Sequence, residues 1–289
     1  MNSWLPFEWI AASRFLREGR LQTIFIIFGV AIGVGVILFM SAALAGQQAN
    51  IVRRVLSAQA HIVLLPPHEV ARPLRAAPGV AQAAIVQKPY QRLRSIDQWQ
   101  RIVEEVGRMR TVTAVSPMAS GPMLAVRGEA TRAVTVMGIE PERYFRIVPL
   151  PEKIVAGVAR LNAEDIVVGT ELASELGVTV GDKLRIASST GPGATLTISG
   201  IVDLGSKPAN QRNTYVSLHT AQALLGLIGG VSSIDLTVPD IYAAEDVAQT
   251  ISAATGVQAD SWIRTNTQLY TAINAQIVEI GRASCRERV

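Results

Sequence analysis

The feature that most constrains this chain is a long stretch near its N-terminus, Leu21 to Val52, that contains no charged residue and no histidine. Its strongly apolar core, Ile24 to Ala45, matches the roughly 20 residues that an α-helix needs to cross a bilayer. The hydrophobic region of a cleaved secretory signal is shorter, about 7–15 residues. The sequence therefore predicts a retained transmembrane helix over residues 21–52.

Residues 1–20 combine apolar side chains at helical spacing with a basic end. The apolar positions are Trp4, Phe7, Ala11 and Phe15, and the arginines are Arg14, Arg17 and Arg20. This pattern favours a short amphipathic helix in the headgroup region, although Glu8 and Glu18 interrupt its apolar stripe. An irregular charged leader is the alternative.

The C-terminal tail, "IGRASCRERV" at residues 280–289, matches what one reading frame of a common sequencing-adapter oligonucleotide encodes, and we interpret it as an artefact. Without it the net charge falls from +4 (27 basic, 23 acidic) to +2 (24 basic, 22 acidic), and Cys285, the only cysteine, is lost. Nucleic-acid binding then loses its main support. A disulfide framework, a cysteine zinc site and a thiol nucleophile are excluded.

The rest of the chain is long enough for two soluble units and shows strand–helix–strand patterns at both ends. The first has a strand at His61–Leu65, a helix over residues 95–109 with a capping box of Ser95 and Gln98, and three further strands at 113–117, 122–128 and 131–139. That helix has an apolar face of Trp99, Ile102, Val103 and Val106. The second has a strand at 232–238, a helix at 243–255 and a strand at 257–262.

We therefore expect an α+β fold in which a split βαβ subdomain, residues 53–143 and 231–265, encloses a β-rich insert at 144–230. In the insert, the strand Ile166–Val168 leads into a two-turn helix that Thr170 caps and Gly177 ends. Gly181 and Asp182 turn into the next strand, and "TYVSLHTAQALLG" predicts a strand followed by a capped helix.

The sequence offers no group of residues that would carry catalysis. "GIVDLGSK" at 200–207 has the glycine spacing of a phosphate-binding loop, but Ser206 replaces its lysine and the segment is not expected to open a helix. "HEVAR" at His68 lacks the second histidine of a zinc motif, and the other two histidines are read as strand and loop residues. A secreted enzyme, cleaved after Ala45 in "ALA", would need a catalytic cluster that the sequence does not provide.

Four stretches in a fixed order carry a family resemblance: "RFLREGRLQTIFIIFGVAIGVGVILF", "IVVGTELASELGVTVGDKLRI", "TYVSLHTAQALLG" and "DSWIRTNTQLYTAI". From about Trp4 to Val278 the chain resembles the permease subunits of ABC transporters in the MacB, FtsX and LolC/LolE superfamily. The resemblance implies a MacB-like periplasmic core domain after the first of four membrane helices. This sequence departs from that pattern because it has only one such helix, so we expect a fragment in which 266–279 leads into a missing second helix.

The resemblance further implies a non-catalytic permease in the bacterial inner membrane, with its main domain in the periplasm. ATP and magnesium would bind to a separate ABC ATPase dimer, and this chain would bind no cofactor or metal. Further partners would be a second permease copy or homologue, membrane lipids and a periplasmic adaptor or acceptor, with no nucleic acid. The cargo would be a lipoprotein, a lipid or another envelope substrate. A singly anchored periplasmic interaction or sensor module is the alternative, and genomic sequence beyond codon 279 distinguishes the two.

Two sets of residues are candidate sites for this mechanical role. Gly29 and Gly33 form a G-x-x-x-G that, with Gly35, is expected to give one small-residue face for helix packing. Trp262, Thr265 and Asn266 follow the last predicted strand and precede a membrane-bound helix, so we expect them to form a coupling junction. Trp262 would sit half buried, and Thr265 would cap the next helix. The alternative for Trp262 is an ordinary core tryptophan that closes the domain.

Overall fold

The computed structural model describes residues 20–56, 59–67, 93–188, 193–268 and 271. The chain divides into two compact units, Met1–Val55 and Leu56–Val289. The sequence length predicts two soluble units after the membrane helix, but this part of the chain forms a single unit. The predicted amphipathic segment before Arg20 and the adapter-like tail lie outside the described residues. So does most of the predicted lead-in at 266–279.

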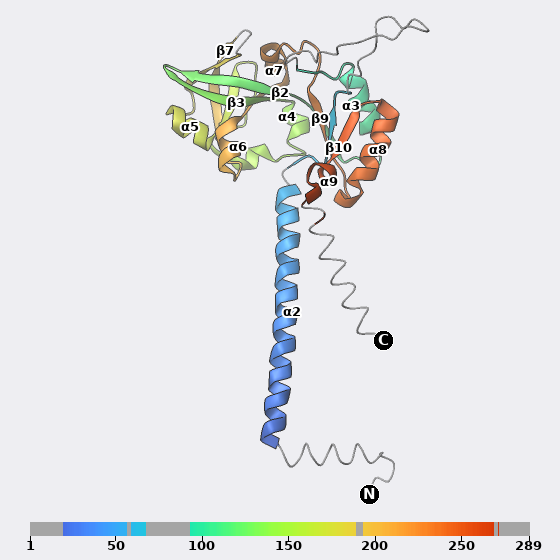
Figure 1. The fold of residues 1–289 in the computed structure, drawn as a ribbon. Coiled ribbons are helices and arrows are strands. Elements are labelled where there is room, and N and C mark those ends of the chain that lie inside the picture. The colour runs from blue at the N-terminus through green and yellow to red at the C-terminus, as the bar shows by residue number, and fades with distance from the viewer. Residues whose placement is uncertain (1–19, 57–58, 68–92, 189–192, 269–270, 272–289) are drawn as a thin grey trace, which may run out of the picture. The chain divides into compact units, whose positions relative to one another are not determined.

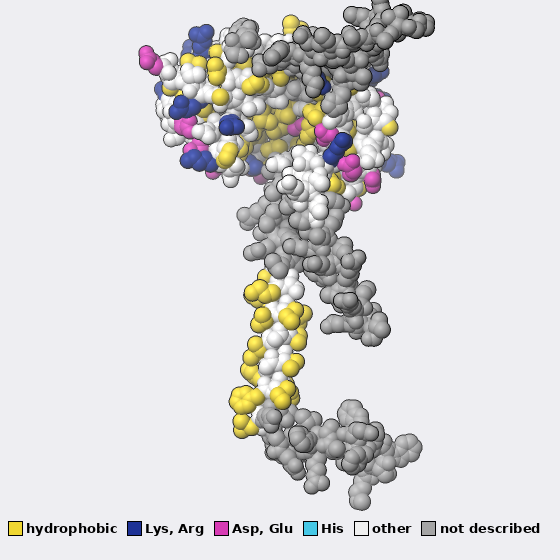
Figure 2. Space-filling view, in the orientation of Figure 1, with side chains coloured by type: hydrophobic (Ala, Val, Ile, Leu, Met, Phe, Trp, Pro, Cys, Tyr) yellow, Lys and Arg dark blue, Asp and Glu magenta, His cyan; other side chains and the backbone are white. Residues whose placement is uncertain are grey.

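The first unit contains one long helix, α2 (Arg20–Leu56). Its window Ile24–Ala43 spans 20 residues with a mean hydropathy of 2.7, enough by length and composition to cross a membrane. At 1.5 Å per residue this window covers about 30 Å, the thickness of a bilayer's hydrocarbon core. Hydrophobic side chains line the visible face of this part of α2 (Figure 2), and the whole window lies outside any core, as expected for a helix that lipid or other helices surround. Its retention as an anchor stays a prediction.

The second unit is built on ten strands (Figure 1). They are β1 (Ile62–Leu65), β2 (Ala114–Arg127), β3 (Ala130–Ile139), β4 (Ile154–Gly157), β5 (Asp165–Gly169), β6 (Lys183–Ala187), β7 (Ala194–Val202), β8 (Asn213–Ser217), β9 (Ser233–Thr237) and β10 (Gln258–Ser261). Their order is β10-β1-β9-β2-β3-β8-β5-β7-β4, and β6 pairs with both β2 and β7.

Six of these strands close into a barrel, because β6 joins the two ends of the row that runs from β2 to β7. β2 takes part through its second half, pairing with β3 from Met118 and with β6 at Leu124–Val126. Leu184, Ile186 and Ile198 are fully buried members of these strands. The helices α5 (Thr170–Leu176), α6 (Lys207–Arg212) and α7 (Leu218–Leu225) connect or flank them.

The other strands form a small antiparallel sheet of β10, β1, β9 and the first residues of β2, Ala114–Met118, which we call the sheet lobe. The helices α3 (Trp99–Gly107) and α8 (Ala244–Thr255) lie beside it in Figure 1. Their buried residues are Ile102, Val103 and Val106 in α3, and Ala244, Ala248 and Ile251 in α8. Alternate residues of the central strands, Ile234 and Leu236 on β9 among them, are fully buried.

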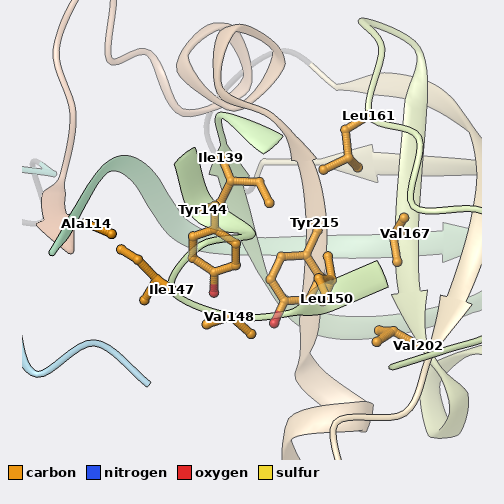
Figure 3. Packing of buried hydrophobic residues seen from close by; sticks show 10 residues of the cluster. All are labelled: Ala114, Ile139, Tyr144, Ile147, Val148, Leu150, Leu161, Val167, Val202 and Tyr215. Atoms are coloured by element: carbon orange, nitrogen blue, oxygen red, sulfur yellow. The ribbon is translucent and has the colours of Figure 1, made fainter. Parts of the chain in front are cut away.

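A short connecting segment lies in a second core between the barrel and the sheet lobe. This wedge, residues 141–153, comprises α4 (Pro141–Tyr144) and the 3₁₀ turn η1 (Leu150–Lys153). Its Tyr144, Ile147, Val148 and Leu150 pack with Ala114 of the sheet lobe and with barrel residues such as Tyr215 (Figure 3). The wedge therefore connects the two parts of the domain through apolar contacts.

Most predicted elements are confirmed, with small shifts at their ends. The strand at 61–65, the helix at 243–255 and the strand-to-helix pattern at 214–226 are all present. Gly177 ends α5 in the left-handed conformation (φ 61°), and Ser217 caps α7 by accepting the Thr220 amide. The division into residues 53–143, 144–230 and 231–265 stays a prediction, although strand pairing places β3 and half of β2 in the barrel before residue 144.

Four local predictions were wrong. Ser95 and Gln98 form no capping box, because Gln98 is left-handed (φ 54°) and the Ser95 hydroxyl donates to Asp97 instead. The strands expected at 113–117 and 122–128 are one continuous β2. Gly169, not Thr170, is the N-cap position of α5. The segment at 200–207 does lead into a helix, α6, where Lys207 pairs with Glu171 at 3.6 Å.

Candidate functional site

The incoming and outgoing chains of the second unit lie next to each other. β1 and β10 are antiparallel neighbours, with Ile62 opposite Ser261. Just beyond this pair the Trp262 amide donates to the His61 carbonyl at 2.9 Å. The residue before β1 and the residue after β10 are therefore joined directly, although 201 positions separate them in the sequence.

Both residues are also held by the segment that follows β9, residues 238–242. The His61 Nδ1 atom lies 3.0 Å from the Val238 carbonyl oxygen and 3.1 Å from the Val238 amide nitrogen, and the ring tautomer decides which bond forms. The Trp262 indole Nε1 donates to the Ile241 carbonyl at 2.6 Å. We call His61, Trp262 and residues 238–242 the junction.

Trp262 is more deeply buried than predicted. Its side chain is 5% exposed, and the Tyr242 ring packs edge-on against it with 6.4 Å between centroids. Tyr242 itself is 56% exposed. The aromatic pair thus runs from the interior of the domain to its surface, with the indole N–H satisfied inside.

The short helix α9 (Trp262–Thr265) follows β10 directly. Ser261 caps it, because the Ser261 Oγ atom accepts the Arg264 amide at 3.2 Å. Thr265 is the last residue of α9, and its predicted role as the cap of the next helix stays a prediction, because most of residues 266–279 lie outside the described residues. The Thr265 hydroxyl donates to the Ser261 carbonyl, and the Asn266 amide and side chain both donate to the Trp262 carbonyl.

Glu245 of α8 supports the start of α9 through Ser261. The Ser261 hydroxyl donates to Glu245 Oε2 at 2.5 Å, and this bond, with one from Gln249, holds the pKa of Glu245 below its ordinary value. Arg264 lies 3.7 Å from Asp260 in a partly exposed pair. Exposed pairs of this kind contribute little to stability, so the Ser261 bonds carry most of the polar contribution here.

The predicted packing face on α2 needs one correction. Gly29 and Gly33 are one helical turn apart and share a face, but Gly35 lies about 200° round the helix from Gly33. It therefore belongs to a different face. Added Cβ atoms at all three glycines would meet nothing within 4 Å, so each leaves room for an approaching helix.

The family model of the MacB-like periplasmic core domain matches residues 23–254. The chain belongs to this family. The match begins inside the apolar helix and ends in α8, so it includes the barrel, the wedge and most of the sheet lobe.

The curated relatives of this MacB-like chain have names that describe membrane proteins. The lipoprotein-releasing system transmembrane protein LolC of Xylella fastidiosa (strain Temecula1) is 24% identical over 269 residues, which cover 88% of this chain and 59% of LolC. LolC of Neisseria meningitidis serogroup B is 20% identical over an alignment that covers 96% of this chain and 64% of that protein. An uncharacterized ABC transporter permease protein of Mycobacterium tuberculosis is 28% identical over 48% of this chain. The chain thus spans about 59% of the length of the Xylella relatives.

Solved structures similar to the MacB-like domain come from extracytoplasmic regions of transporters. The periplasmic region of MacB from Actinobacillus actinomycetemcomitans has a TM-score of 0.49 and 14% identity, covering 77% of this chain and 96% of that one. The extracellular domain of the ABC-type transporter YknZ has a TM-score of 0.44 and 14% identity, covering 58% and 89%.

Sequence reasoning located Trp262 and Asn266 but missed their partners. Ser261 had a readable signal, because serine directly before an apolar helical start is a typical N-cap. His61 and residues 238–242 had none, since nothing in the sequence shows that they meet. Among the described residues, His, Cys, Asp and Glu form no group of three that would hold a metal ion.

Replacing Ser261 with Ala should lower the free energy of unfolding by about 1–2 kcal/mol, because both the cap and the bond to Glu245 are lost. Thr265→Ala is the matched control and should cost less, since its hydroxyl only bonds back to a carbonyl within its own helix. Denaturant unfolding followed by tryptophan fluorescence measures both variants. Equal losses would contradict the assignment of Ser261 as the cap.

Proposed function

We propose that this chain is part of a permease subunit of an ABC transporter in the bacterial inner membrane, with its MacB-like domain in the periplasm. The observation that carries the proposal is the alignment of 88% of the chain with a protein named LolC. By the same reasoning the cargo is a lipoprotein or another lipid-bearing envelope substrate. The name of the relative supports this, and the fold alone does not.

In this proposal the chain performs no chemistry itself. An ABC ATPase dimer on the cytoplasmic side binds ATP and magnesium and hydrolyses the nucleotide. A second permease copy or homologue completes the membrane part, where Gly29 and Gly33 give the close approach between helices. A periplasmic adaptor or acceptor takes the cargo onward.

The junction is the proposed coupling element of this permease. Movement of the membrane helices reaches the domain through its incoming and outgoing chains, and these meet at His61 and Trp262. Both are fastened to residues 238–242 by side-chain bonds, so they move as one body with β9. A loss of either side-chain bond should weaken transmission without unfolding the barrel.

The test is Trp262→Phe in the full-length permease reconstituted with its ATPase. Phenylalanine keeps most of the burial but removes the N–H that donates to Ile241. We expect normal folding and continued ATP hydrolysis, with release of a lipoprotein substrate from proteoliposomes reduced about fivefold or more, equivalent to one lost hydrogen bond of about 1 kcal/mol.

Trp99→Phe is the control, because the Trp99 indole also donates to a backbone carbonyl, that of Gly229 at 3.1 Å, but outside the junction. It should leave both hydrolysis and release unchanged. Wild-type release by Trp262→Phe would refute the coupling role and leave Trp262 as a packing residue.

A further inference from the structure

One carboxyl group lies in the sheet lobe without a counter-charge. Asp235 occupies the middle of β9, between Val63 of β1 and Ser116 of β2. Its residue is 7% exposed, and its Oδ1 atom is buried with no hydrogen-bond partner among the described residues. A buried carboxylate oxygen without a hydrogen-bond partner is costly when the group is charged, so this position requires an explanation.

The side chain of Asp235 points toward the wedge. Because side chains alternate along a strand, Asp235 faces away from Ile234 and Leu236 and shares its face with Ser116. The neighbours of Ser116 on that face of β2, Ala114 and Met118, pack against the core that contains the wedge. Burial raises the pKa of Tyr144 in the wedge, and the negative charge of Asp235 raises it further.

Among the described residues, the partners of Asp235 on β1 and β2 are uncharged, and the titratable side chains nearest to it are Tyr144 of the wedge and His61, which lies two residues before Val63. β1 contributes Val63 and β2 contributes Ser116, while the wedge contributes Tyr144, whose ring centroid lies 6.1 Å from that of Tyr215 on β8. Figure 3 shows both hydroxyl groups pointing to the same side of this core. Of the charged residues of the wedge, Glu142, Arg143, Arg146 and Glu152 are exposed, and Lys153 is half-buried. No salt bridge reaches Asp235 within the part of the chain that the structure describes.

We propose that Asp235 is a proton-operated switch that holds the wedge closed against the sheet lobe when it is protonated and opens it when it is charged. A neutral carboxyl fits this core, whereas a carboxylate needs water or a cation. The wedge is the part that yields, because β9 is held by ladder hydrogen bonds on both edges. The wedge is held chiefly by apolar packing.

The switch lies close to the junction. Asp235 is three positions before Val238, which contacts the His61 ring, and Ala60 packs against the same core as the wedge. Opening of the wedge therefore loosens the support of the incoming chain. This inference concerns the domain alone and does not depend on the proposed transport function.

The test is hydrogen–deuterium exchange of the full chain in lipid nanodiscs, at pH 6 and pH 8.5, with rates corrected for the intrinsic effect of pH. In the wild type, amides of residues 141–153 should lose protection about tenfold at the higher pH, since burial alone raises the pKa of Asp235 to about 7. Asp235→Asn should keep the protection at both pH values. Glu142→Gln removes a carboxylate from the exposed side of the wedge and should respond as the wild type does.

Two results would overturn the switch. One is wedge protection in the wild type that does not change between pH 6 and pH 8.5, and the other is the same change persisting in Asp235→Asn. If the asparagine variant does not fold, Asp235→Thr, a neutral residue that suits a strand, replaces it in the comparison. The wild-type measurement decides the first point without any variant.

Discussion

Asp235→Asn should make the domain more stable at pH 8 by about 4 kcal/mol and leave its stability near pH 4 almost unchanged. The carboxyl has a pKa of about 7 in the folded protein, raised by burial, against about 3.9 in an unfolded chain. Between these values the folded state keeps a proton that the unfolded state has released. The free energy of unfolding therefore falls by about 1.4 kcal/mol per pH unit as the pH rises, and the loss is complete above the folded pKa.

Denaturant unfolding of the full chain in detergent, followed by tryptophan fluorescence from pH 4 to pH 8.5, measures this difference. Asp182→Asn is a control of opposite sign. The Thr179 amide donates to Asp182 and lowers its pKa, so Asp182 stabilises the fold above its unfolded pKa and loses that effect in acid. A variant Asp235→Asn that is less stable than the wild type at pH 8 would show that the carboxylate has a partner.

Gly169→Ala should destabilise the domain by about 3 kcal/mol, the upper part of the usual range for overpacking. A Cβ atom at residue 169 would lie 2.0 Å from the backbone oxygen of Asn210 in α6. Neither side yields easily, because Gly169 ends β5 and the Asn210 side chain is tied to Asp203 and to the Leu204 amide. Glycine is needed here for close approach of two backbones, not for an unusual φ angle.

Gly107→Ala is the matched control, since a Cβ atom at this position at the end of α3 would meet nothing within 4 Å. It should be neutral or gain up to about 1 kcal/mol. Thermal or denaturant unfolding of the two alanine variants provides the comparison. Similar stabilities for both would mean that α6 moves aside at little cost.

Helices and strands were predicted well where neighbouring residues in the sequence determine their ends. Gly177 and Gly181 mark the end of α5 and the turn into β6, and the alternation in residues 131–139 gave β3. Closure of the barrel was not predictable in this way. It depends on β6 meeting residues 124–126 of β2 and on β3 lying parallel to β8, and these pairings join segments far apart in the chain.

The junction shows the same limit. Trp262 was recognisable because a tryptophan follows a strand and precedes a helix, and the structure buries it there. The role of His61 depends on Val238, 177 positions away, and was invisible in the sequence. The additional short helix α9 was not predicted, because the last strand ends one residue before the predicted boundary, at Ser261.

The antiparallel pairing of β1 with β10 has a mechanical consequence. The incoming and outgoing chains leave this pair at the same end, where Ile62 faces Ser261. A load that separates the two chains acts on the hydrogen bonds of the pair one at a time, starting from the Trp262 to His61 bond, and is opposed there only by the side-chain bonds to residues 238–242. A load that pulls both chains in the same direction stretches none of the bonds between them. Such a load is carried by the whole sheet lobe. The lobe therefore resists a force that pulls both chains together more strongly than a force that pulls them apart.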